Sequence, residues 1–446
     1  MNKKVLVITL VLVMAFANSA MAAVTFSGKF TATATQNNFK IFQEKFTLEP
    51  GWEVNIGASN KNATDDVVNW DFSAGINLKE SEFQLGKYKL GLYDDYFKAW
   101  VWGNKQELSD KATYFNMIKA GKTASTMRAR LEVPVMDLAT VTADFADGNT
   151  IRLFVNGKVE EYALGLAYAR KDWDAKDPEK PIDVIVAQAG GAIPAGDLTV
   201  NAKAAAGIKL GENLGMAFGF SADTQLTEEL EVEGSVTHAN DHWAFDALTA
   251  KNTVLNAGAT YTEAAYQVTA SVTETLIKEG TNKNEISLGA KYRFSDKLGY
   301  GDLFKGDKWY TNDAPAVRAF ADLIDLKLDE VGVEVAAPVV DEMIWAKAYG
   351  KYGQYDYKDE VAVEDKTEKS YKVGADLYIK ATPKLVVTPF GYFEGIGKVL
   401  TFGTKASYAI GSSDTKLSLE VKKVTAEDIL ATKRAELIKA SISVPF

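Results

Sequence analysis

The sequence predicts an exported all-β protein, a transmembrane antiparallel β-barrel with an even strand number of roughly 20 to 26. Three observations lead to this prediction. The chain begins with an export signal, and apolar and polar residues alternate along almost all of the remainder. After the signal, no apolar run reaches the length of about 18 residues that a membrane-spanning helix needs.

The export signal occupies the first 22 residues. Lys3 and Lys4 precede an apolar run at residues 5–16, and Ala20-Met21-Ala22 supplies the small residues of a cleavage site. A retained anchor helix is the alternative, but this apolar run is too short to span a bilayer comfortably. We therefore expect a signal peptide at residues 1–22, cleavage after Ala22, and one barrel domain at residues 23–446.

Composition excludes some classes of protein. The net charge is -10, and loss of Lys3 and Lys4 with the signal leaves 48 basic against 60 acidic residues, or -12. An acidic chain repels phosphate backbones, so nucleic acid is not an expected partner. Cysteine is absent, so an exported chain must gain stability from something other than disulfides. A closed sheet in which every strand is paired would supply it.

Alternation begins where the signal ends. In residues 24–34 the even positions are apolar or small and the odd positions are mostly polar, which places the two sets on opposite faces of a strand. The same period recurs at residues 68–78, 285–294, 371–380 and 416–422. About two dozen such segments of roughly 8–13 residues can be drawn, close to the length of a tilted membrane strand.

A soluble β-sandwich would also alternate, so other features must decide. Aromatic residues gather near the ends of the apolar parity, as in the girdles of membrane barrels. The opposite parity is densely charged, which suits a wet lumen. No linker or change in composition interrupts the series. These features favour the barrel.

The longer connections test the strand count, because membrane barrels have short periplasmic turns and longer outer loops. If the first strand leaves the periplasm, residues 60–66, 171–181, 238–251, 358–367 and 425–434 should share the outer end. Residues 104–113 and 295–314 should not, so either the count slips there or these segments fold into the lumen. Residues 425–433 resemble a capped helical turn, and residues 316–328 fit helix and strand equally.

The last strand carries a family resemblance. Ile438, Ile442, Val444 and Phe446 share one apolar parity, and the chain ends in an aromatic residue. This ending resembles the terminal strand of bacterial outer-membrane porins. The resemblance implies insertion into the outer membrane by the barrel-assembly machinery, contact with outer-membrane lipids, and passage of small polar solutes or ions.

Three arginines are candidates for the pore lining. Arg128, Arg130 and Glu132 share a parity, and Arg152 occupies the polar parity of what the pattern indicates is the neighbouring strand. If the apolar parity faces lipid, all of them face the lumen, where charged rings set the selectivity of a pore. Ordinary salt bridging to Glu132 or Asp144 is the competing and somewhat favoured interpretation.

Histidines and aromatic residues offer weaker candidates. His238 and His242 have a spacing that could bind zinc on a helix, but a solvated loop explains them more simply, and we expect no metal, cofactor or catalytic site. An aromatic track in the lumen could stack sugars, although interface girdles explain the same residues. These residues are Trp100, Trp102, Tyr349, Tyr352, Tyr355 and Tyr357.

The expected function is therefore passive diffusion of small polar solutes and ions through a water-filled channel, without enzymatic activity. No separate plug is expected, because strands begin directly after the signal. The alternatives are a substrate-specific sugar channel and an abundant structural protein of the outer membrane. The acidic excess, if the lumen inherits it, predicts weak cation selectivity. A homo-oligomer is compatible with all of these functions.

Overall fold

The computed structural model describes most of the chain after the predicted signal. The described residues are 23–37, 47–59, 68–79, 82–120, 127–146, 150–171, 181–211, 213–243, 252–278, 280–296, 299–300, 303–304, 313–359, 364–395, 399–410, 415–425 and 437–445. Residues 1–22, and with them the predicted cleavage site, lie outside this part. No helix in the described part is long and apolar enough to cross a membrane.

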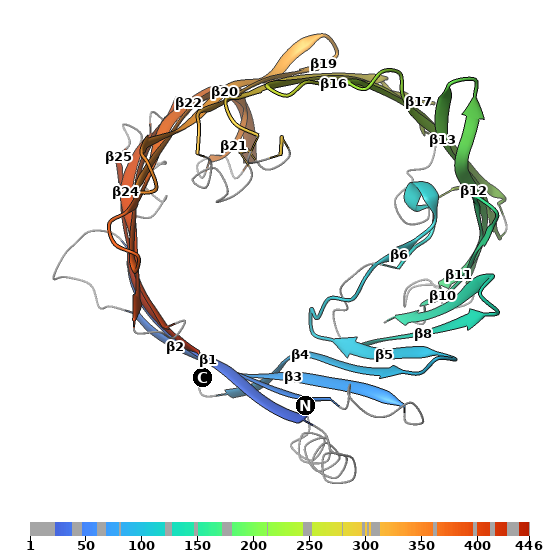
Figure 1. Cartoon of the computed structure of the whole chain (residues 1–446), viewed down its shortest axis with the longest axis horizontal. Coiled ribbons are helices and arrows are strands. Elements are labelled where there is room, and N and C mark those ends of the chain that lie inside the picture. The colour runs from blue at the N-terminus through green and yellow to red at the C-terminus, as the bar shows by residue number, and fades with distance from the viewer. Residues whose placement is uncertain are drawn as a thin grey trace.

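Twenty-four strands form one antiparallel sheet, shown from one end in Figure 1. They are β1 (Ala23–Asn37), β2 (Thr47–Ser59), β3 (Asn69–Lys79), β4 (Glu82–Tyr93), β5 (Lys98–Gly103), β8 (Met127–Val135), β9 (Ala139–Ala146), β10 (Thr150–Val159), β11 (Tyr162–Lys171), β12 (Ile182–Ala195), β13 (Leu198–Leu210), β14 (Gly215–Gln225), β15 (Leu230–Ala239), β16 (Asn252–Thr262), β17 (Tyr266–Ile277), β18 (Lys283–Arg293), β19 (Ala316–Ile324), β20 (Lys327–Val340), β21 (Ile344–Asp359), β22 (Glu364–Lys380), β23 (Leu385–Glu394), β24 (Val399–Ile410), β25 (Thr415–Thr425) and β26 (Leu437–Pro445).

The sheet closes on itself. Each strand pairs with its neighbour in sequence, β5 pairs with β8, and the last strand β26 returns to pair with β1, with Lys29 opposite Pro445 and Asn37 opposite Leu437. Closure leaves no unpaired edge in the sheet, which is what a bilayer demands of a β structure. The predicted class, a transmembrane antiparallel β-barrel with an even strand number between 20 and 26, is confirmed.

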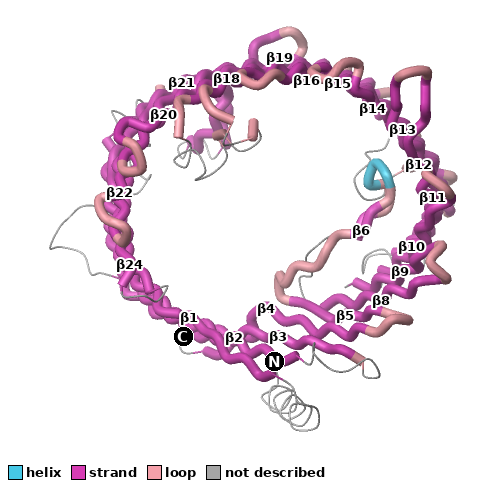
Figure 2. The backbone as a smooth tube through the Cα atoms, viewed as in Figure 1, coloured by secondary structure: helices cyan, strands magenta, loops and turns pink. Residues whose placement is uncertain are grey.

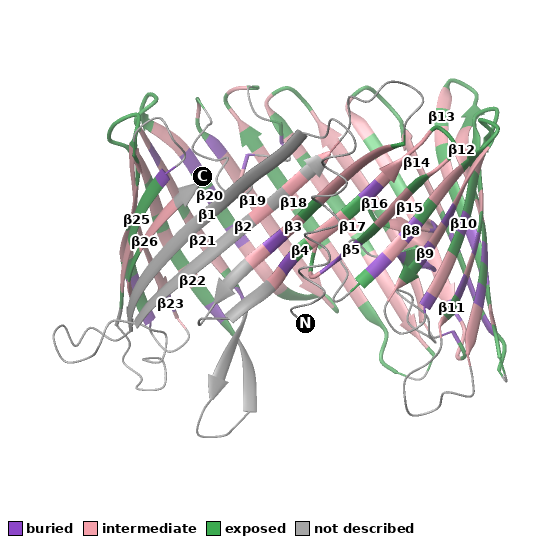
Figure 3. Cartoon of the chain, turned by 90° about the horizontal axis from the view of Figure 1, so that it is seen from below, coloured by how far each residue is buried: buried purple, intermediate pink, exposed green. Residues whose placement is uncertain are grey.

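Alternation along each strand produces two faces. Leu153, Val155, Leu164 and Leu166 on β10 and β11 point outward and are 37–53% exposed. Similar exposed apolar residues recur around the ring, and in water such a surface would drive aggregation. In a bilayer it is the lipid-facing band of a tilted strand (Figure 3). The opposite parity forms the lumenal face.

The two rims of the barrel differ. We call the rim where β1 begins and β26 ends the terminal rim, and the opposite one the far rim. Most connections at the terminal rim are short, such as residues 136–138, 160–161 and 196–197. The longer connections β11–β12, β15–β16 and β25–β26 leave from the far rim.

Two predictions about the connections were wrong. The connection containing residues 60–66 joins β2 to β3 at the terminal rim, and the one containing residues 104–113 joins β5 to β8 at the far rim. The strand count from sequence therefore slips before residue 60 and again between residues 113 and 171. Turns as short as residues 160–161 leave little signal between alternating segments. The connection that contains residues 295–314 joins β18 to β19, whose ends meet at the terminal rim, as predicted.

The two segments for which the sequence allowed a helix have separate outcomes. Residues 316–328 contain the whole of β19 and the start of β20, with a turn at Asp325 and Leu326. Residues 426–433, where a helical turn was predicted, lie outside the described residues. The described part contains one helical element, the short 3-10 helix η1 (Tyr114–Asn116), which lies inside the ring (Figure 2).

Candidate functional site

The lumen contains a segment that folds inward from the far rim. We call residues 104–126, the connection from β5 to β8, the inserted segment; it is described as far as Ala120. It carries the two-residue strands β6 (Lys111–Ala112) and β7 (Lys119–Ala120), which pair with each other, and η1 between them. In Figure 1 it runs inside the ring from β5 toward β12 and β13. The sequence prediction allowed for this inward fold as one of two explanations.

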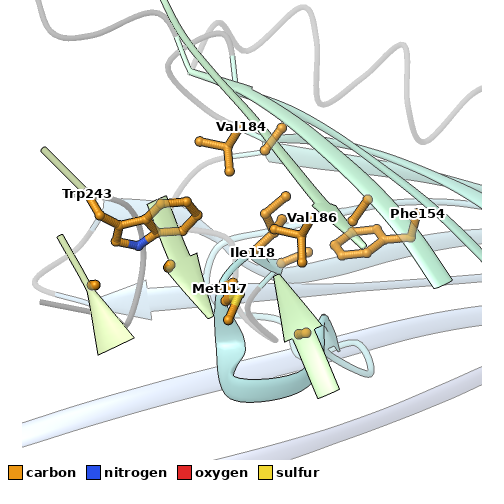
Figure 4. Close-up of a cluster of buried hydrophobic side chains, with 12 residues drawn as sticks. Met117, Ile118, Phe154, Val184, Val186 and Trp243 are labelled. Atoms are coloured by element: carbon orange, nitrogen blue, oxygen red, sulfur yellow. The ribbon is translucent and has the colours of Figure 1, made fainter. Parts of the chain in front are cut away.

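Apolar packing holds the tip of the inserted segment against the wall. Met117 and Ile118 are fully buried among lumenal residues of β10–β15 and the far-rim connection, including Phe154, Val186 and Trp243 (Figure 4). The lumenal face of these strands is apolar because the inserted segment covers it and excludes water. Burial of one large apolar side chain is worth about 1.5–3 kcal/mol, so this cluster is a strong attachment.

Glycines on the wall make room for the aromatic rings of the segment. A Cβ at Gly219 on β14 would lie 2.4 Å from the ring of Phe115, and one at Gly190 on β12 would lie 2.8 Å from the hydroxyl of Tyr114. Gln188 adds a polar contact, since its Oε1 accepts a hydrogen bond from the Tyr114 N–H at 2.6 Å. The segment thus fits one place on the wall.

The base of the segment is held by charged groups. Lys111 Nζ lies 2.9 Å from Glu132 Oε1 on β8. Arg130 Nη1 donates to the Ser109 carbonyl at 2.5 Å. These contacts also establish that Arg130 and Glu132 are on the lumenal side of β8.

Arg128 and Arg130 are buried around one carboxylate. Arg128 donates to Asp144 Oδ1 through Nε at 2.8 Å and through Nη2 at 2.6 Å, while Arg130 Nε donates to Oδ2 at 2.8 Å. Both guanidinium groups lie over Trp102, 5.5 Å and 5.4 Å from its ring centroid. Asp144 and Trp102 are 0% exposed, and the arginines 5% and 2%. The cluster is therefore packed wall, covered by the inserted segment.

Arg152 is a cross-strand neighbour of the same carboxylate. Asp144 on β9 has Arg130 as its Cα partner on β8 and Arg152 as its partner on β10. The salt bridging to Asp144 that competed with a selectivity role is present for Arg128 and Arg130. An effect of the four pore-lining candidates, Glu132 included, on ion flow stays a prediction.

A second connection approaches the lumenal face at the terminal rim, between β18 and β19. Leu303 is fully buried, and Tyr300 is nearly so, beside Ala316. The Tyr300 carbonyl accepts a hydrogen bond from Lys291 Nζ at 3.0 Å, and its hydroxyl donates to the Glu263 carbonyl at 2.7 Å. These residues belong to the segment 295–314, for which inward folding was one of two explanations that the sequence left open.

The lumenal face of β18–β26 is basic. On β18–β26 the described lumenal positions carry more basic than acidic residues. The basic ones are Lys283, Lys291, Arg293, Arg318, Lys327, Lys347, Lys351, Lys372, Lys380, Lys405, Lys416, Lys422 and Lys439. The acidic ones are Glu285, Asp322, Glu330, Glu334, Asp376, Glu394 and Glu420.

The acidic excess of the chain lies largely in the connections. The short turns of the terminal rim alone contain many acids, namely Asp94, Asp95, Asp137, Glu160, Glu161, Asp197, Glu228, Glu229, Asp341 and Glu342. The described lumenal wall of β18–β26 therefore does not inherit the sign of the whole chain. The predicted cation selectivity assumed that the lumen inherits the acidic excess, and this assumption does not hold for β18–β26. The composition of the chain does not distinguish residues of the wall from residues of the turns.

Aromatic rings lie on the same basic wall. Phe320 covers Gly332, Tyr349 covers Gly374 and Phe390 covers Gly403, in each case the cross-strand partner, whose Cβ would lie within 2.8 Å of a ring atom. Lysine and arginine side chains lie over these rings or their neighbours; Lys372 Nζ is 3.8 Å from the centroid of Tyr392. Rings that lie over glycines are fixed in position.

The predicted aromatic track is split between the faces. Trp100, Trp102 and Tyr349 are lumenal, but Tyr352 points outward and is 38% exposed. The side chains of Tyr355 and Tyr357 lie outside the described residues. Tyr392 and Phe390, which do join the lumenal set, were missed because the alternation does not say which strands are neighbours.

The histidines lie at the far rim. His238 Nδ1 is 2.8 Å from Thr253 Oγ1, and its ring packs on the outward Phe218 at 5.1 Å between centroids. Among the described residues no group of His, Cys, Asp and Glu has a geometry that would hold a metal.

The assembly strand β26 pairs with both β25 and β1. Ile438 and Ile442 share one face of it, with Ile442 opposite Leu417. The side chain of Val444 and the whole of Phe446 lie outside the described residues. Their predicted part in assembly stays a prediction.

Comparison with known proteins gives a resemblance of architecture. No protein-family model matches the sequence, and no curated protein matches it. Among solved structures, the P pilus usher (PapC) translocation pore aligns with TM-score 0.40 and 9% identity over 95% of this chain and 99% of that one.

Two structures from Pseudomonas aeruginosa also align. The siderophore receptor PirA gives TM-score 0.46 and 9% identity over 94% of this chain and 80% of that one. OccK11 (OpdR) gives 0.39 and 8% over 68% and 91%. These values add no argument about function. The chain resembles outer-membrane β-barrel proteins in fold class, and that assignment depends on its own closed antiparallel sheet.

Proposed function

We propose that this protein is a passive, water-filled channel of the bacterial outer membrane for small polar solutes and ions. The proposal includes removal of a signal peptide, insertion by the barrel-assembly machinery and no catalytic activity. The closed barrel with an apolar outer face supports the membrane location.

One observation carries the channel function: charged lumenal side chains on β24–β26 are solvated and not packed into a core. The side chain of Lys405 is 59% exposed although it points into the ring, and Glu420, 3.7 Å from it, is 28% exposed. Charged groups that keep their water require an aqueous lumen. The inserted segment follows one side of the wall (Figure 1), as expected of an element that narrows a wide barrel.

A substrate-specific sugar channel is the second candidate. Its support is the row of lumenal rings Phe320, Tyr349, Phe390 and Tyr392, whose faces could stack on sugars. Cations already lie over several of these rings, so fewer faces are open to a solute. This observation favours the general channel.

Planar-bilayer recording tests the proposal. The purified, heat-modifiable protein should produce stepwise conductance that rises in proportion to salt concentration. Liposome swelling with neutral sugars of increasing size should then give a graded cutoff for a general channel. A rate that saturates with one sugar would favour the specific channel. If the folded protein yields no conductance, the channel proposal fails and the alternative of a structural outer-membrane protein stands.

A further inference from the structure

A hollow of about 410 Å³ lies in the lumenal face across β15–β19. Hydroxyl groups of Thr260, Thr269, Ser271 and Ser287 line it. Two glycines, Gly258 and Gly289, supply no side chain where one would otherwise occupy it. The result is a polar recess in the wall.

Two cations share one end of this hollow. Lys291 on β18 and Arg318 on β19 are Cα partners, and both line it. Like charges directly opposite each other destabilise an antiparallel pair. A bound anion would remove that penalty.

Neither cation is fully neutralised by the protein. Among the described residues no carboxylate lies within ion-pair distance of Lys291, and its one hydrogen bond is to the Tyr300 carbonyl. An ammonium group has three donors, and the described part of the chain uses one of those of Lys291. Arg318 Nη1 is 3.7 Å from Glu334, a carboxylate that also pairs with Lys351 at 3.1 Å.

The carboxylates of the hollow are distant from the cation pair. Asp322 is four residues further along β19, roughly 13 Å from Arg318 at the rise of a strand. Glu233 is on β15, three strands from Lys291, roughly 14 Å at the usual strand spacing. Both separations exceed the screening length of about 10 Å at moderate salt, so the cation end of the hollow is locally positive.

We propose that the lumen prefers anions and that a small oxyanion, a phosphate or a carboxylate, binds in this hollow between Lys291 and Arg318. Tyr300 fixes the lysine, Glu334 orients the arginine, and the hydroxyl of Thr269, opposite Gly289, offers a further hydrogen bond. This inference rests on the proposed channel function and specifies the class of solute.

Reversal potentials across a KCl gradient give the first test. The wild-type channel should favour chloride, and Lys291→Gln should lower the chloride-to-potassium permeability ratio by roughly twofold or more. Lys291→Arg should keep the ratio. The matched control is Lys209→Gln on β13, because Lys209 is also lumenal and also donates to a backbone carbonyl, that of His242, at 2.6 Å.

Block of the chloride current by a solute distinguishes a specific anion-binding site from a general excess of positive charge. Millimolar phosphate, and separately acetate, should reduce chloride current through the wild-type and Lys209→Gln channels but not through Lys291→Gln. Block by phosphate alone or by acetate alone would identify which oxyanion the hollow accepts. Equal effects of the two glutamine variants would overturn the site, and a conducting channel without anion preference would overturn the inference while the channel function stands.

Phosphorus NMR supplies a readout that needs no conduction. The phosphate line should broaden in the presence of detergent-folded wild-type barrel and stay sharp with Lys291→Gln. Broadening without conductance would disprove the channel and keep the anion site. Equal line widths for both proteins, together with no block, would disprove the site.

Discussion

Arg130 and Asp144 are Cα partners on adjacent strands, and their side chains form a 2.8 Å ion pair that is fully buried. Arg128 completes the carboxylate's contacts from the same strand as Arg130. Because Arg130 also donates to the Ser109 carbonyl, the pair connects the barrel wall to the inserted segment. Arg128 and Arg130, two of the pore-lining candidates from the sequence, thus stabilise the barrel wall where the inserted segment attaches to it.

Asp144→Ala should strongly destabilise the barrel. Removal of one member of a buried ion pair leaves uncompensated charge and costs about 3–5 kcal/mol. Urea unfolding of the detergent-folded protein, followed by tryptophan fluorescence, would measure this loss. Asp223→Ala is the control, because Asp223 makes an exposed hydrogen bond to Asn201 and should cost less than about 1 kcal/mol. Equal losses would contradict the cluster's role.

Cysteines at Phe115 and Gly219 should form a disulfide. Phe115 Cγ is 2.6 Å from the position of a Cβ at 219, so the two Cβ atoms would lie near the range of about 3.5–4.5 Å that a disulfide uses. The chain has no cysteine of its own, which leaves the result free of competing pairs. Mass spectrometry of oxidised protein would detect the bond.

The control for this cross-link pairs Phe115→Cys with Gly289→Cys on β18. That position belongs to a part of the wall that the described inserted segment does not contact. Cross-linking of both pairs to the same extent would show that the segment does not rest on β14.

Leu166→Arg should impair stability in the membrane far more than Ser271→Arg. Leu166 is 53% exposed on the outer face of β11, where an arginine near the bilayer midplane costs about 2–4 kcal/mol. Ser271 lies on the lumenal face of β17 and lines the hollow, where an arginine meets water. Unfolding in lipid vesicles would compare them, and a larger loss for the lumenal variant would reverse the assignment of the two faces.

Deletion of Phe446 should strongly reduce assembled, heat-modifiable protein on semi-native gels. The residue follows β26, the strand that must pair with β1 to close the barrel. Phe446→Tyr retains an aromatic end and should assemble normally. Normal assembly of the deletion variant would mean that the terminal aromatic residue is dispensable.

Membrane-extracted protein should begin at Ala23. Cleavage after Ala22 removes the two lysines of the signal, Lys3 and Lys4, and leaves β1 at the N-terminus. Intact-mass spectrometry checks this directly. A mass that includes Met1 in the assembled fraction would contradict the signal-peptide prediction.

Local sequence pattern determined the fold class, since a period of two needs only neighbouring residues to define two faces. It also predicted that Arg128, Arg130 and Arg152 share the lumenal parity. It indicated that residues 104–113 and 295–314 depart from the pattern of the other long connections. Pairing between strands is a long-range property, so the sequence could not show that Asp144 lies between Arg130 and Arg152.

Only the tertiary structure decided the sign of the lumenal wall. Acids in turns and acids on strands count equally in a composition, yet the turns place theirs at the rim while the strands direct lysines such as Lys291 inward. The hollow likewise depends on register, because Lys291 and Arg318 are 27 positions apart in sequence and become neighbours only when β18 pairs with β19. The barrel follows from alternation within each strand, and its chemistry follows from which strands lie side by side.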